Sequence, residues 1–186
     1  MNRVFFTSDN HYFHENIIRY CQRPFDGYES MNAEMIHRWN SMVNHDDIGI
    51  FVGDISAGLK GRVDELREII KSLNGRKILI RGNHDHQPDD WYLDSGFLKV
   101  VEAIKFGSVV LTHYPLSSLE RRGLRGEDLF GEFSHIVHGH VHDPGPNFER
   151  HYNVAADRNN FMPVTLDVAI PQSFQQAFMD DLLNFL

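Results

Sequence analysis

Short apolar runs recur along the chain, and each run stops at a turn signal followed by a polar side chain. The runs are Val4–Phe6, Ile48–Val52, Ile78–Ile80, Val109–Leu111 and Ile136–Val137. Most of their residues are β-branched or aromatic, which is the composition of buried strands. The pattern therefore predicts a strand at each of these positions.

Helical periodicity appears between the runs and again at the end of the chain. Apolar residues between Met35 and Val43, and between Leu66 and Leu73, each fall on one helical face. Gly75 suits a left-handed C-cap after the second of these helices. From Ser173 a Ser-x-x-Gln pattern predicts a capping box, and a stripe of apolar residues follows it: Phe174, Phe178, Leu182 and Phe185. We expect this last helix to pack on the body of the protein rather than on a second subunit.

Alternating strands and helices predict an α/β fold, and 186 residues with 41% hydrophobic content suit one domain over residues 1–186. The single cysteine, Cys21, excludes a disulfide within the chain and suits a reducing compartment. Without an apolar stretch long enough for a signal peptide or a membrane span, a cytoplasmic location is expected. The net charge of −8 argues against a long nucleic-acid duplex as partner. The segment DPGPN at 143–147 predicts a turn.

The predicted strands end in polar groups that can bind metal ions. In an α/β sheet, loops at the carboxyl ends of the strands converge on a common site. Here those loops carry Asp9, His11, Asp54, Asn83, His84, His113, His140 and His142. Imidazole nitrogen with carboxylate and amide oxygen, and no thiolate, favours Mn, Fe, Zn, Co or Ni over calcium, magnesium or a thiolate zinc site.

The number of these groups predicts two divalent ions rather than one. Setting His84 aside, seven ligands remain, more than a single tetrahedral ion can use, and Asp54 is the central candidate for a bridging carboxylate. Two such ions about 3.5–4 Å apart activate a hydroxide and polarise a phosphate. A histidine near the ions but not bound to them would protonate the leaving group.

Five sequence blocks resemble those of the calcineurin-like metallophosphoesterase family, in the same order. They are SDNH (8–11), GD (53–54), GNHD (82–85), THYP (112–115) and GHVH (139–142). Residues 153–167 also resemble the family's closing strands, and residues 8–25 (SDNHYFHENIIRYCQRPF) resemble small single-domain bacterial or phage members. The resemblance implies a four-layer α/β/β/α sandwich.

The resemblance also implies roles for individual residues. One ion would be held by Asp9, His11, Asp54 and His142, and the other by Asp54, Asn83, His113 and His140. His84 would contact the phosphate and act as the general acid. The block GDISAGL lacks the second aspartate and the arginine of the family's protein phosphatases, so the usual partner of the catalytic histidine is missing. Asp85 or another carboxylate is left as the candidate to orient His84.

These features predict a dinuclear-metal phosphoesterase that acts on small phosphate mono- or diesters, including nucleotides. His14, Arg23 and Arg81 are candidate substrate contacts, the arginines because guanidinium binds phosphate oxygens in pairs. A nuclease or phosphodiesterase acting on nucleic-acid ends is the enzymatic alternative. A metal-binding interaction scaffold without catalysis is the other.

Overall fold

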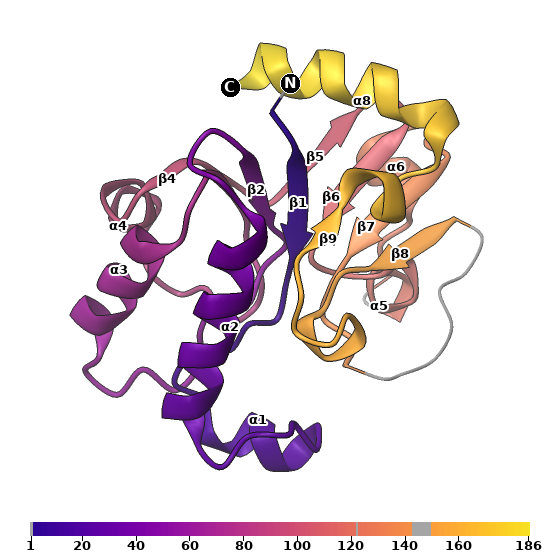
Figure 1. Ribbon diagram of the computed structural model, residues 1–186. Helices are drawn as coiled ribbons and strands as arrows, with labels where there is room; N and C mark the ends of the chain where they lie inside the picture. Colours follow the sequence, from indigo (N-terminus) through magenta and orange to yellow (C-terminus); the bar gives the residue numbers. More distant parts are fainter. Residues whose placement is uncertain (1, 122, 143–149) are drawn as a thin grey trace.

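Two β-sheets pack face to face in this computed structural model, which describes residues 2–121, 123–142 and 150–186. The turn predicted at 143–147 lies outside these ranges. The first sheet has the order β4-β3-β2-β1-β9, and the second has the order β5-β6-β7-β8 (Figure 1). In the first, β1 to β4 run parallel and β9 is antiparallel to β1. In the second, β6, β7 and β8 are parallel and β5 is antiparallel to β6.

The strands are short and lie at or near the predicted positions. Those of the first sheet are β1 (Val4–Thr7), β2 (Ile48–Phe51), β3 (Arg76–Ile80), β4 (Phe97–Val101) and β9 (Val164–Thr165). Those of the second are β5 (Ala103–Phe106), β6 (Val109–Thr112), β7 (His135–His138) and β8 (His151–Asn153). All five runs read from the hydrophobic pattern are strands. The edge strands β4 and β5 were not predicted, because they are half-exposed and their apolar pattern is interrupted.

Helices flank both sheets and complete the predicted α/β/β/α sandwich (Figure 1). On the side of the first sheet lie α1 (Glu15–Tyr20), α2 (Tyr28–Met42), α3 (Val63–Ser72) and α4 (Asp89–Asp94). The second sheet is covered by α5 (Leu116–Arg121) and α6 (Gly126–Phe130), and a 3₁₀ turn, η1 (Ala156–Arg158), follows β8. The chain ends with α7 (Leu166–Ala169) and α8 (Gln172–Phe185). Within the described ranges, no helix is both long and apolar enough to pass through a membrane.

Alternate residues of each central strand serve two different cores, because successive side chains point to opposite faces of a sheet. Phe5 of β1 packs outward against the α2 and α3 side, together with Trp39 and Leu66. Phe6 points the other way, into the layer between the sheets, where it meets Val137. Burial on both faces explains why these strands read as continuous apolar runs.

Helix α8 closes one end of the layer between the sheets. Phe178 and Leu182 are fully buried there, and the Phe178 ring lies against Phe6 and Phe106. The predicted packing on the body is therefore confirmed. The prediction of a capping box at Ser173 was wrong, because the N-cap of α8 is Pro171, which makes no side-chain capping bond. Gly75 has the expected positive φ of 97°, but α3 has already ended at Ser72.

The buried face of α8 gives a stability prediction. Phe178→Ala should lower the free energy of unfolding by about 3–5 kcal/mol, because it leaves a cavity beside the rings of Phe6 and Phe106. Leu183→Ala in the same helix, at a side chain that is 54% exposed, should change it by less than about 0.5 kcal/mol. Equilibrium urea denaturation measures both. Equal effects of the two substitutions would show that α8 does not close the core.

Candidate metal centre

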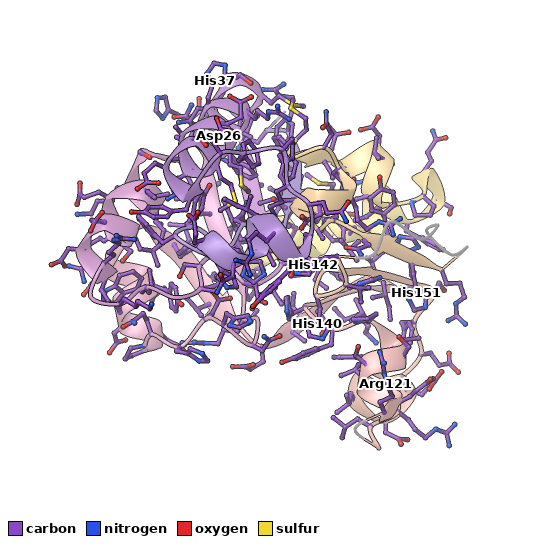
Figure 2. All side chains as sticks on the ribbon, turned by 90° about the horizontal axis from the view of Figure 1, so that it is seen from below. Asp26, His37, Arg121, His140, His142 and His151 are labelled. Carbon is purple, nitrogen blue, oxygen red and sulfur yellow. The ribbon has the colours of Figure 1, made fainter. Side chains whose placement is uncertain are left out.

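The carboxyl ends of β1, β2, β3, β6 and β7 lie at one edge of the sandwich and bring the predicted residues together. Three groups of side chains there offer ligand atoms within 4.8 Å of one another and are able to bind metal ions. Two of them consist of predicted ligands only, and the third is Cys21, His142 and Asp157. The first group is Asp9, His11 and His142, and the second is Asp54, His113 and His140. Figure 2 shows His140 and His142 where the two halves of the molecule meet, with Asp26 and His37 far away.

Several of these residues have a left-handed backbone, with φ of 54° at Asp9, 52° at His11, 56° at Asp54 and 69° at His140. Aspartate and histidine tolerate this region better than most residues, although it still costs about 1–3 kcal/mol. Each strand therefore ends in a sharp turn that directs a polar side chain back across the sheet edge. Two of these turns approach each other so closely that position 139 must be glycine. A Cβ at Gly139 would collide with the side chains of Ser8 and Asp9.

Asp9 and Asp54 use their two carboxylate oxygens in the same way: one accepts hydrogen bonds and the other faces the centre. Asp9 Oδ2 accepts hydrogen bonds from the Ser8 hydroxyl at 2.6 Å and the His140 backbone N–H at 2.9 Å. Its Oδ1 is buried without a hydrogen-bond partner in the described residues. Asp54 Oδ1 accepts the His84 backbone N–H at 2.8 Å, while Oδ2 faces the imidazoles of His11 and His113. One oxygen of each carboxylate thus fixes a neighbouring loop and the other faces the centre.

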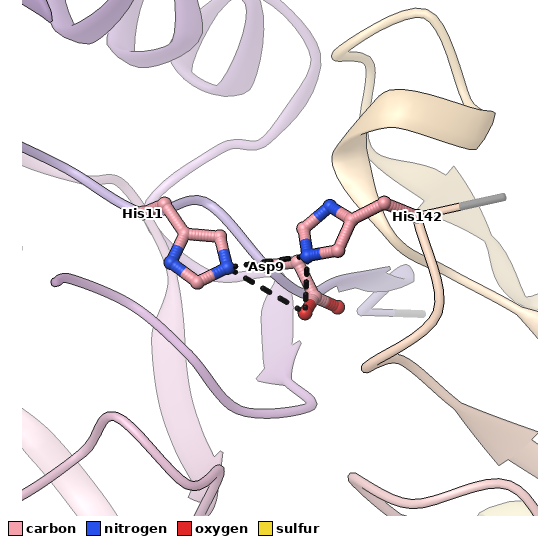
Figure 3. A group of neighbouring side chains, drawn as sticks. All are labelled: Asp9, His11 and His142. Atoms are coloured by element: carbon pink, nitrogen blue, oxygen red, sulfur yellow. Dashed lines mark hydrogen bonds and ion pairs between the residues drawn. The ribbon is translucent and has the colours of Figure 1, made fainter. Parts of the chain in front are cut away.

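The first group has the spacing of ligands around one ion (Figure 3). His142 Nε2 lies 3.3 Å from His11 Nε2 and 3.5 Å from Asp9 Oδ1, and His11 Nε2 lies 3.9 Å from the same oxygen. Ligands about 2.0–2.2 Å from one tetrahedral ion are roughly 3.3–3.6 Å apart. Figure 3 also shows that His11 and His142 approach Asp9 from opposite sides.

The second group has a similar spacing around His113. Its Nε2 lies 3.4 Å from Asp54 Oδ2 and 3.2 Å from Asn83 Oδ1. The His113 Nδ1–H is directed to the Val52 carbonyl at 2.9 Å, so the Nε2 lone pair faces these two oxygens. His140 completes the group, with its ring centroid 5.1 Å from that of His113.

Both groups contain more hydrogen-bond acceptors than donors, which is the condition of a cation site. Burial acts to lower the pKa of His113, but the carboxylates of Asp54 and Asp9 outweigh it and raise the pKa to about 9. Burial acts to raise the pKa of Asp54, but His113 and the backbone N–H of His84 lower it to about 2. A proton on His113 or a bound metal ion would therefore each neutralise the same excess of negative charge. The residues fit divalent ions bound by nitrogen and oxygen.

A carboxylate that the sequence did not single out, Asp157, supports the first group. Its Oδ2 accepts from His142 Nδ1 at 2.6 Å, which directs the His142 Nε2 lone pair toward Asp9 and His11. Arg23, a predicted substrate contact, is buried and binds both oxygens of Asp157 at 2.8 and 2.7 Å. Arg23 also donates to the Asp9 and Asn10 carbonyls, so its donors are directed to the protein. The only sequence feature that pointed to Asp157 was its position within residues 153–167, the segment that resembles the family's closing strands.

Asp85 holds the backbone of two loops rather than the His84 ring. Its carboxylate accepts the N–H groups of Asp54, Ile55 and Gly82 at 2.8, 3.0 and 2.8 Å. Asp85 therefore joins the loop after β2 to the loop after β3, and none of its hydrogen bonds within the described ranges reaches the His84 imidazole. Arg81, another predicted substrate contact, donates to the Asp85 and Gln87 carbonyls and to Asp89, which shapes the same loop.

His84 and His14 lie at the open side of the centre. The His84 side chain is exposed, and its ring centroid is 5.3 Å from that of His11. His14 is half-buried, 5.4 Å from His11 and 6.4 Å from His84 by ring centroids. All residues predicted to act at the site, except the two arginines, therefore face the centre or its opening.

The Asp157–His142 pair gives a prediction about metal affinity. Asp157→Asn should weaken metal binding about 10–100-fold, because a neutral amide polarises the imidazole less than a carboxylate does. Chelator competition on folded samples would measure the affinity, with Asp26→Asn, far from the centre, as the control. Unchanged affinity in Asp157→Asn would remove Asp157 from the site.

Comparison with one solved structure supports the fold, and two further structures show a weaker similarity. A protein of unknown function from Aquifex aeolicus superposes with a TM-score of 0.68 at 24% identity, covering 89% of this chain and 96% of that chain. The nuclease MPE of Pseudomonas putida has a TM-score of 0.47 at 20% identity, covering 75% of this chain and 61% of the nuclease. An archaeal phosphodiesterase has a TM-score of 0.47 at 17% identity, covering 82% of each chain.

Comparison with known sequences adds close relatives. No protein-family model matches the chain. An uncharacterized protein of Methanocaldococcus jannaschii is 34% identical over 179 residues, covering 91% of this chain and 90% of that protein. The gene 66 protein of Mycobacterium phage L5 is 29% identical over 167 residues, covering 77% and 79%. The chain therefore belongs to the same family as this archaeal protein, and its five motif blocks, gathered at one edge of an α/β/β/α sandwich, are those that resemble the calcineurin-like metallophosphoesterases.

Proposed function

We propose that the protein is a dinuclear-metal phosphoesterase that hydrolyses small phosphate mono- or diesters, including nucleotides. The observation that carries the proposal is the position of Asp54 Oδ2. It lies 3.8 Å from His11 Nε2 of the first group and 3.4 Å from His113 Nε2 of the second. One carboxylate oxygen is therefore shared by both groups, as a bridge between two ions requires.

The remaining ligands divide between the two sides of Asp54. Asp9, His11 and His142 would hold one ion, and Asn83, His113 and His140 the other. When bound, the pair of ions would lower the pKa of a water molecule to about 7 and polarise phosphate oxygens. Mn, Fe, Zn, Co and Ni all match this set of nitrogen and oxygen donors.

His84 is placed to give a proton to the leaving group. Its backbone N–H is fixed by Asp54 Oδ1, while its ring projects to the open side next to His11. The ring accepts no hydrogen bond from the described residues and donates none to them, so it is free to contact a substrate oxygen. Asn83 and His84 are adjacent in sequence but have different roles: the amide binds metal and the imidazole faces the substrate.

The bridge is tested by Asp54→Asn. This substitution should lower both metal content and hydrolysis of p-nitrophenyl phosphate and its bis-ester, because it removes the charge shared by the two groups. Metal analysis after reloading with Mn, Co, Ni or Zn gives the content, and Asp26→Asn is the matched control. Full metal content in Asp54→Asn would contradict the bridging role.

The proton donor is tested by His84→Gln. The substitution should leave the metal content unchanged and lower the rate about 10²–10⁴-fold, the usual contribution of a general acid. His37→Gln, at an exposed position on α2, should leave both unchanged. Loss of metal from His84→Gln would show that His84 is a ligand. A folded wild-type protein that binds metal but hydrolyses neither ester would support the scaffold alternative.

A further inference from the structure

A pocket of about 190 Å³ opens beside the metal centre on the side of His84. The loop after β2 forms one wall at residues 56–59, and the loop after β3 forms the other with His84, His86 and Gln87. Tyr92 of α4 is buried and contributes to the lining. His84 thus belongs to the rim of the metal centre and to the wall of the pocket at once.

We propose that this pocket binds the leaving group of the phosphoester and selects a leaving group that carries a nucleobase. The inference rests on the proposed function, because the pocket is assigned through the role of His84. A leaving-group oxygen that takes its proton from His84 must lie within hydrogen-bond reach of that ring. The rest of the leaving group then extends past His84 toward Gln87 and Leu59.

The size and shape of the pocket suit a planar ring. An apolar cavity of about 150 Å³ holds a benzene ring, so this pocket is large enough for a ring system. Gly58 leaves one wall flat: a Cβ built there would meet only His14 Cδ2, at 4.0 Å. The rings of His84 and His86 have centroids 6.3 Å apart and provide faces and edges for stacking.

The chemistry of the lining suits a neutral heterocycle with hydrogen-bonding edges. None of the residues lining this pocket is Asp, Glu, Lys or Arg, so it offers no fixed charge to a charged leaving group. The Gln87 side-chain amide makes no hydrogen bond to the described residues, so its donors and its acceptor are available. A glutamine amide pairs with a donor and an acceptor on one base edge. An alkyl leaving group would use neither the amide nor the ring faces.

The inference is tested by two substrates that share one leaving-group alcohol. Ribonucleoside 5′-monophosphates and ribose 5-phosphate both release a ribose 5′-hydroxyl, but only the nucleotides carry a base. With the manganese-loaded protein, kcat/KM for at least one nucleotide should exceed that for ribose 5-phosphate by about 10-fold or more, the scale of one base-stacking contact. Gln87→Leu and His86→Ala should each reduce this ratio. Gln172→Leu, at an exposed position on α8, should keep the ratio.

A binding measurement separates this inference from the proposed function. The four ribonucleosides, added singly, should shift the His84 and His86 ring resonances in NMR spectra, and ribose should not. A base-independent rate, a ratio that Gln87→Leu does not reduce, or the absence of nucleoside shifts would each overturn the pocket assignment while the phosphoesterase activity stands. Nucleoside shifts without hydrolysis of any ester would overturn the proposed function and keep the pocket.

Discussion

The structure depends on how two buried aspartates use their two oxygens. Asp9 and Asp54 each accept backbone N–H groups from a neighbouring loop with one oxygen and present the other to the centre. These bonds offset the cost of left-handed backbone at both residues. The Asp9 bond also joins the two sheets, because it reaches the loop after β7 of the second sheet. The Asp54 bond joins the loops after β2 and β3 within the first sheet. The same carboxylates therefore hold the fold at its functional edge and define the cation sites.

Further polar groups keep this concentration of acceptors in place. Arg23 is buried against Asp157 and the Asp9 carbonyl, and it brings a positive charge behind the first group. Asp85 binds three backbone N–H groups of two loops, which fixes the positions of Asp54 and Gly82. A buried arginine and a buried aspartate would be costly if unpaired, and here each is fully engaged. Their role is to set the geometry of the residues that face the centre.

The proposed function uses the contrast between the centre and the pocket beside it. The centre gathers carboxylates, imidazoles and an amide whose lone pairs converge, which suits cations and the phosphate they bind. The residues lining the pocket carry no fixed charge, and they offer ring faces and the Gln87 amide, which is unpaired among the described residues. His84 lies between the two, fixed through its backbone by Asp54. A substrate that spans both would place its phosphate on the metals and its leaving group past His84.

The sequence by itself determined the strands β1, β2, β3, β6 and β7, the fold class and the set of polar residues that meet at their ends. These features are local: an apolar run, a turn and a polar group lie within a few residues of one another. Only the tertiary structure decided which carboxylate oxygen faces the centre, that Arg23 is buried, and that Asp157 orients His142. The Arg23–Asp157 pair joins residues 134 positions apart, and Asp85 faces the backbone of a loop some 30 positions away, at Asp54 and Ile55. Such contacts arise from the packing of loops against one another, and no periodic pattern in the sequence predicts them.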